Sequence, residues 1–482
     1  MSNLRENIAD VVSKMPMVVV VALFAVGIFF GDRAEVPLWL YGVALAVTLC
    51  GAFLVKGALR VVGILLAVLF LGAALHSLSF RRVIPYDKPL EMWLEVEQMT
   101  AVRSGYTSTE ARIVECEEPN VEGCKVVIWG DSLLRFSAKD RLGVRLPLRR
   151  FRAEREGYAK LMYNRGFVGS ISISSRTNYE YKPTERESLH DIATRRLQES
   201  LNEGYARGVV LAMTVGERGE ITPELRQAYA ASGASHLLAV SGLHVGIVFF
   251  IINLLLVPLA MLRYGNVVRS VAVVALIWLY VILCGMSPSA VRAAIMFSLL
   301  QLSITSLKSY NSVNILSATA FVMLLFDTHL LFDISFELSF LAVAGILLWA
   351  VPLYRLARTR FRIVNSLIAV MCVGVASTLV TLPLVASTFS VVSLVGVLIN
   401  PVVILLAYGV VVCGVVALAI PAVAPLALAF AEWQNWVVVK AAELPYSHFD
   451  CGLSEGAMWA IYALFLVVTL IFFVVPTKKR IK

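Results

Sequence analysis

The sequence is poor in charge and in cysteine, and each scarcity excludes a class of protein. Only 16% of its 482 residues are Asp, Glu, Lys or Arg, whereas 59% are hydrophobic. A soluble globular domain carries nearer a quarter of charged residues. The seven cysteines are too few and too scattered for a disulfide framework. The composition therefore excludes an ordinary soluble protein and a small disulfide-rich secreted domain.

Metal-binding and nuclease motifs are also missing. The sequence has no HExxH motif, no cluster of Cys and His at ligand spacing, and no HxHxDH pattern. We therefore expect no metal, no cofactor and no catalytic residue, and we do not expect an enzyme.

Long apolar runs are what the chain has instead. Each is near the length of about 20 residues that a helix needs to cross a bilayer. The runs predict a polytopic α-helical membrane protein. Spans are expected at residues 16–31, 38–55, 58–79, 236–262, 267–285, 288–306, 311–327, 334–354, 364–388, 393–420 and 456–475.

Alternate loops are basic, which orients the chain. Lys56 and Arg60 lie between the second and third spans, and four arginines lie within residues 355–362. The positive-inside rule places the N-terminus and the basic C-terminus in the cytoplasm, with residues 80–235 outside. In a bacterium this is the cytoplasmic (inner) membrane. Residues 1–79 are expected to form a retained anchor of three spans.

After residue 390, the predicted number of membrane crossings no longer agrees with a cytoplasmic C-terminus. Either residues 390–401 are re-entrant, or residues 421–443 add a crossing. Residues 422–442 contain Glu432, Trp433, Trp436 and Lys440, a mixture more typical of an interfacial helix. Asn400-Pro401 favours a discontinuous helix at that point.

Residues 80–184 form a polar insertion without a span. Loose alternation of apolar and polar residues predicts strands at 91–102, 107–116, 124–129, 141–148 and 166–175, with a helix near 154–163. This pattern predicts a small all-β, OB-like extracytoplasmic domain. Residues 185–235 are expected to be amphipathic linker helices, with 186–213 on the surface, before a channel domain at 236–482.

Cys116 and Cys124 flank a Pro-, Asn- and Gly-containing turn. Pairing of the strands across this turn would bring the thiols together, and an extracytoplasmic position permits oxidation. A disulfide is therefore expected, with two reduced thiols as the alternative.

Basic charge is concentrated between residues 135 and 165, a segment that contains ten Lys or Arg and only three acidic residues. Cations with interleaved aromatic rings suit single-stranded nucleic acid. A solvated basic surface, or one resting on anionic lipid, is the alternative. The candidate contacts are Arg135, Lys139, Arg141, Arg145, Arg149, Arg150, Phe151, Arg152 and Tyr158.

Residues 236–246 (HLLAVSGLHVG) place polar groups where a helix enters lipid. Such groups are costly there and usually functional or paired. Gly242 and Gly246 lie one turn apart and let a neighbour approach the backbone. The candidate residues of this segment are His236, Ser241, Gly242, His244, Gly246 and, deeper, Asn253.

Later spans carry further polar residues, namely Ser289, Arg292, Asp333, Glu337 and Asn400. Arg292 needs a carboxylate partner in lipid, and Asp333 or Glu337 can supply it. The cluster has four interpretations: a pair that fixes helix packing, the lining of a transport path, a hydrolytic triad of Ser241 with a histidine, or a metal site.

The segment 236–246 resembles the signature of the ComEC family, the inner-membrane DNA-uptake channels of bacterial competence. Residues 288–294 (PSAVRAA), 336–342 (FELSFLA) and 383–401 are similar to its later blocks, in order. The resemblance covers most of the chain. Residues 80–180 resemble the family's OB-like domain.

The resemblance implies passage of single-stranded DNA across the membrane. Many members also carry a metallo-β-lactamase-like nuclease domain, and this chain resembles the form without it. The implied partners are single-stranded DNA, membrane lipid, a separate nuclease, a DNA receptor and a cytoplasmic motor, with a homo-oligomer as a further expectation. The alternatives are a transporter of a smaller solute and a membrane hydrolase that uses Ser241 and His244.

Overall fold

The chain folds into two compact units. The computed structural model describes residues 15–34, 36–80, 84–97, 101–103, 106–131, 134, 136, 139–151, 159, 162–163, 165–174, 177–183, 187–305, 311–389, 391–393, 395–444 and 448–474. We call residues 1–19, 188–320 and 337–482 the membrane unit. We call residues 20–187 and 321–336 the β unit.

Among the described residues, eight helical segments are long and apolar enough to cross a membrane. Four shorter apolar helices accompany them. This confirms the expected class, a multi-pass helical membrane protein.

Three apolar helices open the chain: α2 (Pro16–Arg33), α3 (Leu38–Leu54) and α4 (Ala58–Phe80). Glycines let α2 and α4 meet backbone to backbone. A Cβ at Gly27 would lie 2.0 Å from the carbonyl oxygen of Leu69, and one at Gly72 would lie 2.4 Å from that of Phe24. Small residues at a helix crossing permit this approach.

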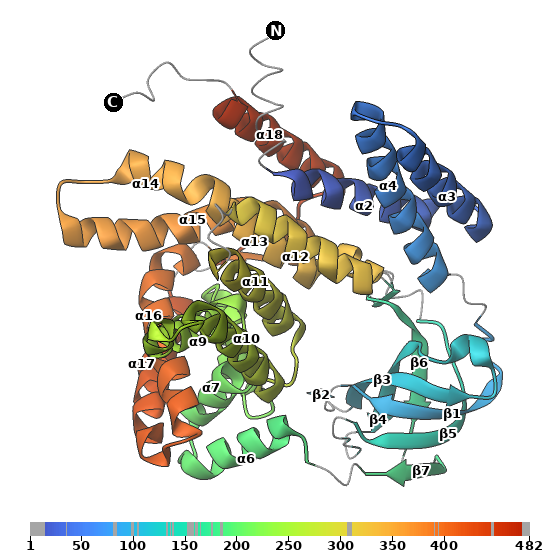
Figure 1. Cartoon of the computed structure of the whole chain (residues 1–482). Coiled ribbons are helices and arrows are strands. Elements are labelled where there is room, and N and C mark those ends of the chain that lie inside the picture. Colours follow the sequence, from blue (N-terminus) through green and yellow to red (C-terminus); the bar gives the residue numbers. More distant parts are fainter. Residues whose placement is uncertain are drawn as a thin grey trace. The chain divides into compact units, whose positions relative to one another are not determined.

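Seven strands form the sheet of the β unit, in the order β6-β4-β3-β1-β5-β7 with β2 beside β3 (Figure 1). All neighbours are antiparallel except β4 and β6. An isolated bridge between Arg149 and Ser170 joins the end of β5 to β6. The strands are β1 (Pro89–Val96), β2 (Ala101–Arg103), β3 (Tyr106–Cys116), β4 (Lys125–Asp131), β5 (Arg141–Pro147), β6 (Phe167–Ile173) and β7 (Tyr179–Lys182).

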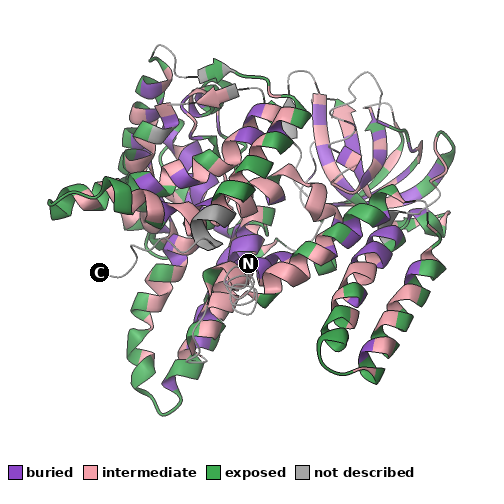
Figure 2. Cartoon of the chain, turned by 90° about the horizontal axis from the view of Figure 1, so that it is seen from above, coloured by how far each residue is buried: buried purple, intermediate pink, exposed green. Residues whose placement is uncertain are grey.

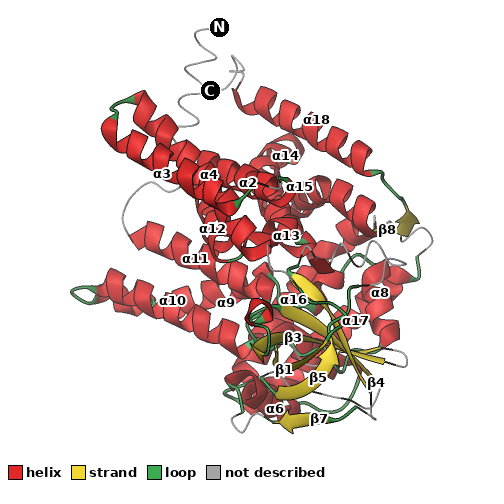
Figure 3. Ribbon diagram, turned by 90° about the vertical axis from the view of Figure 1, so that its right-hand side faces the viewer, coloured by secondary structure: helices red, strands yellow, loops and turns green. Residues whose placement is uncertain are grey.

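The strands alternate between buried and solvent-facing residues, which is why they were recognisable in the sequence. Figure 2 shows buried bands alternating with half-buried and exposed ones along the strands. The buried side chains, among them Leu90, Leu94, Ile113, Val126 and Ile171, pack into one core. Figure 3 shows β1, β3, β4 and β5 side by side. The strands expected at 107–116, 124–129, 141–148 and 166–175 are confirmed as β3, β4, β5 and β6. The strand expected at 91–102 is not continuous, because β1 ends at Val96 and β2 begins at Ala101, and β7 is additional. Of the helix expected near 154–163, the structure describes residues 159, 162 and 163 alone.

The two cysteines of the β unit do not pair as expected. The backbone N–H of Ile113 donates to the carbonyl of Cys124 at 2.9 Å, so Ile113 lies opposite Cys124. Cys116, three residues further on, is instead the partner of Met92 in β1. No bond joins the two sulfurs. The turn is asymmetric because a short 3-10 helix, Pro119–Val121, occupies it. Burial raises the pKa of the Cys116 thiol, which slows its oxidation.

In its described residues, the membrane unit is helical apart from one small strand pair, β8 (Val391–Ser393) with β9 (His448–Asp450). Its α-helices are α6 (Leu189–Ser200), α7 (Tyr205–Thr214), α8 (Pro223–Ala231), α9 (Gly242–Leu255), α10 (Gly265–Leu283), α11 (Pro288–Thr305), α12 (Ser312–Phe326), α13 (Ile334–Gly345), α14 (Val351–Ala357), α15 (Arg362–Phe389), α16 (Val395–Ala417), α17 (Ala424–Ala442) and α18 (Glu455–Val474). Shorter turns are η3 (Ser235–Leu238), η4 (Val257–Met261), η5 (Thr328–Phe332, in the β unit), the π-turn η6 (Ile346–Ala350) and η7 (Pro421–Val423).

Helix α7 corrects the expectation that residues 186–213 lie on the surface. Its segment from Val209 to Met213 is wholly buried at the centre of the unit's core. The helix packs against α16 and α17. It carries one charged residue, Arg207, so it is apolar nearly all round, which is typical of a buried helix.

One expectation about the C-terminal helices is also wrong. Helix α16 runs without a break through Asn400 and Pro401, so it is not discontinuous. The segment Pro421–Ala442, for which an interfacial helix was expected, is long and apolar enough to cross a membrane by length and composition. It packs along α16 in a helical hairpin.

Candidate functional site

The segment 236–246 forms a tight turn that leads into α9. Ser241 has extended backbone angles and precedes the first helical residue, Gly242. Its backbone N–H donates to Nδ1 of His244 at 3.2 Å. The His244 side chain is completely buried. The histidine ring therefore caps the start of its own helix and fixes the turn.

The two glycines of the segment face α11. A Cβ at Gly242 would lie 3.8 Å from Cβ of Ala293, and one at Gly246 would lie 3.1 Å from the ring of Phe297. Phe297 in turn stacks on Phe249, with ring centroids 4.7 Å apart. The glycines thus provide room for a neighbouring helix.

Three segments far apart in the sequence meet at this turn. The hydroxyl of Ser289, at the start of α11, donates to the carbonyl of Val240. Gly233 has a φ of +76° and approaches Gly396 at the start of α16, where a Cβ on Gly233 would lie 3.3 Å from Cα. Residues 232–246, 289–293, 393, 395 and 396 therefore form one polar turn cluster in the membrane unit.

The remaining polar residues of the membrane unit lie in several environments. His236 is exposed, and Arg292 is buried in the first turns of α11. Glu337 and Asn400 are half-buried in α13 and α16. Asn253 lies deeper in α9 and accepts from Arg269 of α10, at 3.1 Å to its Oδ1.

The geometry weakens the hydrolase interpretation. His244 contacts the backbone N–H of Ser241, and within the described residues its ring makes no hydrogen bond to the Ser241 hydroxyl. A nucleophile–base pair needs that contact. No group of three or more His, Cys, Asp or Glu among the described residues is arranged to hold a metal ion.

The basic candidates of the β unit fall into two groups. In one the positive charge lies near a carboxylate of the sheet, and in the other it does not. Arg141 pairs with Glu95 at 3.1 Å, and Arg145 lies opposite Glu91 in the β1–β5 register. Lys139, Arg149 and Arg150 are exposed and contact no carboxylate of the described residues within 4 Å. Arg135, Arg152 and Tyr158 lie outside the described residues.

Two exposed arginines lie where β5 meets β6. The guanidinium of Arg150 lies 4.6 Å above the ring of Tyr86, whose hydroxyl donates to the carbonyl of Val168. Arg149 forms the backbone bridge to Ser170. A backbone bridge holds Arg149, the Tyr86 ring holds Arg150, and both side chains are exposed, so this seam is a well-defined cationic surface of the β unit.

The aromatic candidates need one correction. Phe151 is buried and packs edge-on against Tyr163, with centroids 5.2 Å apart, so it cannot stack on a base. Trp93, which sequence reasoning missed, lies on the outer face of β1. Its indole covers Gly143, and Nζ of Lys182 lies 4.1 Å above the ring.

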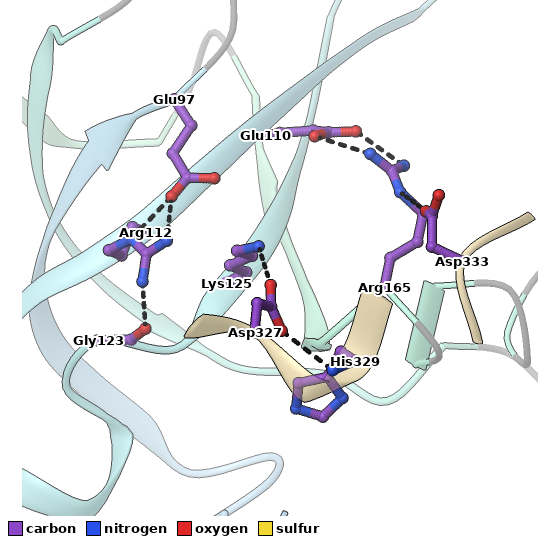
Figure 4. Close-up of polar contacts among 9 residues, drawn as sticks. All are labelled: Glu97, Glu110, Arg112, Gly123, Lys125, Arg165, Asp327, His329 and Asp333. Atoms are coloured by element: carbon purple, nitrogen blue, oxygen red, sulfur yellow. Dashed lines mark hydrogen bonds and ion pairs between the residues drawn. The ribbon is translucent and has the colours of Figure 1, made fainter. Parts of the chain in front are cut away.

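A second polar cluster, which we call the junction, joins residues 327–333 to the sheet within the β unit (Figure 4). Arg165 binds both oxygens of Glu110, at 3.0 and 3.2 Å, and its Nε lies 3.6 Å from Asp333. Lys125 lies 3.7 Å from Asp327. Asp333 was one of the two carboxylates, with Glu337, expected to pair with Arg292; it contacts Arg165 and caps α13 through the N–H of Phe336.

Replacing Arg165 with methionine is expected to destabilise the β unit by about 2 kcal/mol. The change leaves two partly buried carboxylates facing each other without their cation. The matched control is Arg112→Met, which removes the more exposed pair with Glu97 and is expected to cost less than about 1 kcal/mol. Thermal unfolding of the purified variants measures both, and equal losses would contradict the role assigned to Arg165.

Comparison with known proteins identifies the family of the chain. The family model described as "Competence protein" matches residues 213–478, more than half of the chain. The chain therefore belongs to the competence protein family, as the ComEC-like signature predicted. The match includes the turn cluster.

Two relatives share part of the sequence. An "Uncharacterized protein" of Aquifex aeolicus is 34% identical over 165 residues, which are 34% of this chain and 38% of the relative. "ComE operon protein 3" of Bacillus subtilis is 31% identical over 203 residues, which are 41% of this chain and 24% of the relative. The matched parts thus span less than two fifths of either relative. No solved structure matches.

Proposed function

We propose that the protein conducts single-stranded DNA across the bacterial cytoplasmic membrane during DNA uptake. The observation that carries the proposal is the family match over residues 213–478, which includes the turn cluster. The partial relative named "ComE operon protein 3" supports it. We place the N-terminus and the basic C-terminus in the cytoplasm and the β unit's sheet outside, where incoming DNA arrives.

The sheet supports a DNA-receiving role, and we assign it to the OB-like class. Its pairing runs β1 to β3 to β4, continues to β6 in parallel, and returns through the Arg149–Ser170 bridge to β5 and β1. OB-folds are small Greek-key barrels that bind oligonucleotides. The exposed arginines 149 and 150 supply cations for phosphates.

The turn cluster supports a role in the conduit. The cluster contains the buried His244, the start of α16 and two glycines that adjoin α11. Polar groups and close helix packing therefore occur together there. Polar groups at membrane depth mark substrate pathways. We propose that a separate nuclease degrades the strand that is not transported, that a receptor protein delivers the DNA, and that a cytoplasmic motor supplies the driving force. We also propose that the working form is a homo-oligomer in lipid.

Binding of oligo-dT to the full chain in nanodiscs tests the DNA-receiving surface. The double variant Arg149→Ala/Arg150→Ala is expected to lower affinity at least about tenfold at low salt. It should also reduce the slope of log affinity against log salt by about 1 to 1.5, because two phosphate contacts are lost.

Arg141→Ala is the matched control, since Glu95 already compensates that charge. It should change affinity less than about threefold. Wild-type protein that does not bind oligo-dT at low salt would contradict the proposal and favour a transporter of a smaller solute. Uptake of labelled DNA into the cytoplasm of cells that carry either variant extends the test to transport.

A further inference from the structure

A completely buried histidine lies near the end of the membrane helix α4. Nδ1 of His76 lies 3.0 Å from Oγ1 of Thr328, and Nε2 lies 3.4 Å from Oδ1 of Asp32 in α2. Both ring nitrogens are therefore engaged, one by a carboxylate. An ionisable residue at such a depth is costly, and this makes a functional role the default hypothesis.

A second histidine lies against the first. The rings of His76 and His329 have centroids 5.3 Å apart. The backbone N–H of His329 donates to Asp327 (Figure 4). Its side chain packs on Gly166, where a Cβ would lie 3.3 Å from the ring. Gly166 has a φ of +82°, so its bare backbone accommodates the imidazole. His329 thus lies between α4 and the sheet.

The titratable groups around the two rings come from four elements. Asp32 comes from α2, His76 from α4, Asp327 precedes η5 and His329 lies within it, and Lys125 comes from β4. Two carboxylates favour a proton on the imidazoles, whereas Lys125 and the mutual repulsion of the rings oppose it. The cluster can therefore accept protons in the range where histidine titrates.

Burial lowers the pKa of His329 from its ordinary value of 6.5; His76 and Lys125 add to this, and Asp327 and Asp32 oppose it. We call His329 docked when its ring lies between α4 and the sheet. Just below pH 6.5, the docked ring binds fewer protons than a solvated ring. Docking is fully favourable above that pH and weakens as the pH falls below it.

We propose that His76, His329, Asp32 and Asp327 form a proton-binding latch that holds residues 327–333 between α4 and the sheet. With neutral imidazoles the segment stays docked. When the rings bind protons, the charged imidazoles repel each other and Lys125, and the segment is released. Because Asp333 caps α13 at the end of this segment, release reaches the start of that helix. The latch is independent of what the protein transports.

Hydrogen exchange of the full chain in nanodiscs tests the latch. Backbone amides of residues 327–333, corrected for the intrinsic pH dependence of exchange, are expected to lose protection at least about fivefold between pH 7.5 and 5.5. The double variant His76→Gln/His329→Gln keeps hydrogen-bonding groups without titration, so its protection should not change with pH. His190→Gln alters a histidine outside the cluster and should retain the wild-type response.

The variant Asp327→Asn keeps both histidines. It provides a second test that remains valid if the double variant misfolds. It removes a carboxylate that favours the proton in the docked ring, so the pKa of docked His329 falls further below that of the released ring. The midpoint of release should therefore move to higher pH by about half a unit or more. Protection that is equal at both pH values in the wild type, or a wild-type pH response in the double variant, would overturn the proposal. An unmoved midpoint in Asp327→Asn would overturn it as well.

Discussion

Replacing Gly27 with leucine is expected to separate α2 from α4 and to destabilise the β unit by about 3 kcal/mol or more. A Cβ at Gly27 would lie 2.0 Å from the carbonyl oxygen of Leu69, and one at Gly31 would lie 2.7 Å from that of Ala73. These neighbours are helix backbone, which cannot rotate away as a side chain can. Overpacking at such a crossing therefore forces the helices apart.

Gly42→Leu in α3 is the matched control, because nothing lies within 4 Å of a Cβ at that position. The same bulk is added to an apolar helix, without the crossing. We expect Gly42→Leu to leave thermal unfolding in detergent and resistance of the sheet to limited proteolysis unchanged. Comparable losses in the two variants would show that hydrophobic bulk, not the α2–α4 crossing, is responsible.

Replacing Gly414 with valine is expected to have a similarly large effect on the membrane unit. A Cβ at Gly414 in α16 would lie 2.1 Å from Oγ1 and 3.2 Å from Cβ of Thr214, the last residue of α7. Thr214 is completely buried, so it has no space into which to move. We expect a loss of about 3 kcal/mol or more, because α7 must shift within a close-packed core.

Gly374→Val in α15 is the control for this change, since a Cβ there would meet nothing within 4 Å. The yield of monodisperse protein and its unfolding temperature measure the difference. A Gly414→Val protein as stable as Gly374→Val would contradict the close contact between α16 and α7.

Regular elements were predictable from the sequence because each has its own periodicity. Long apolar runs gave the spans, and alternation gave β1, β3, β4, β5 and β6. Helix α7 was misplaced because ten residues with one arginine at the start resemble an amphipathic linker, and periodicity does not reveal what surrounds a helix. The break expected at Pro401 failed because neighbouring helices can support a proline within a membrane helix.

The candidate sites were predictable only in part. The segment 236–246 stood out because its polar residues interrupt an apolar run. The partner of Asp333 was not predictable, because Arg165 lies far from it in the sequence and only the fold brings them together. His76 was missed although it carries the same signal, a polar residue within a span. Phe151 was wrongly assigned because spacing does not show whether a ring faces solvent or the core.

The buried position of α7 also has a consequence for biosynthesis. The hydroxyl of Tyr229 in α8, the helix that follows α7, donates to Asn435 in α17, 206 residues further along the chain. Gln434, next to Asn435, reaches back to Met213 within α7 itself. The neighbours that cover α7 therefore leave the ribosome long after it does. Until α16 and α17 have been inserted, α7 needs provisional shelter, from lipid or from the insertion machinery, and the membrane unit closes around it late.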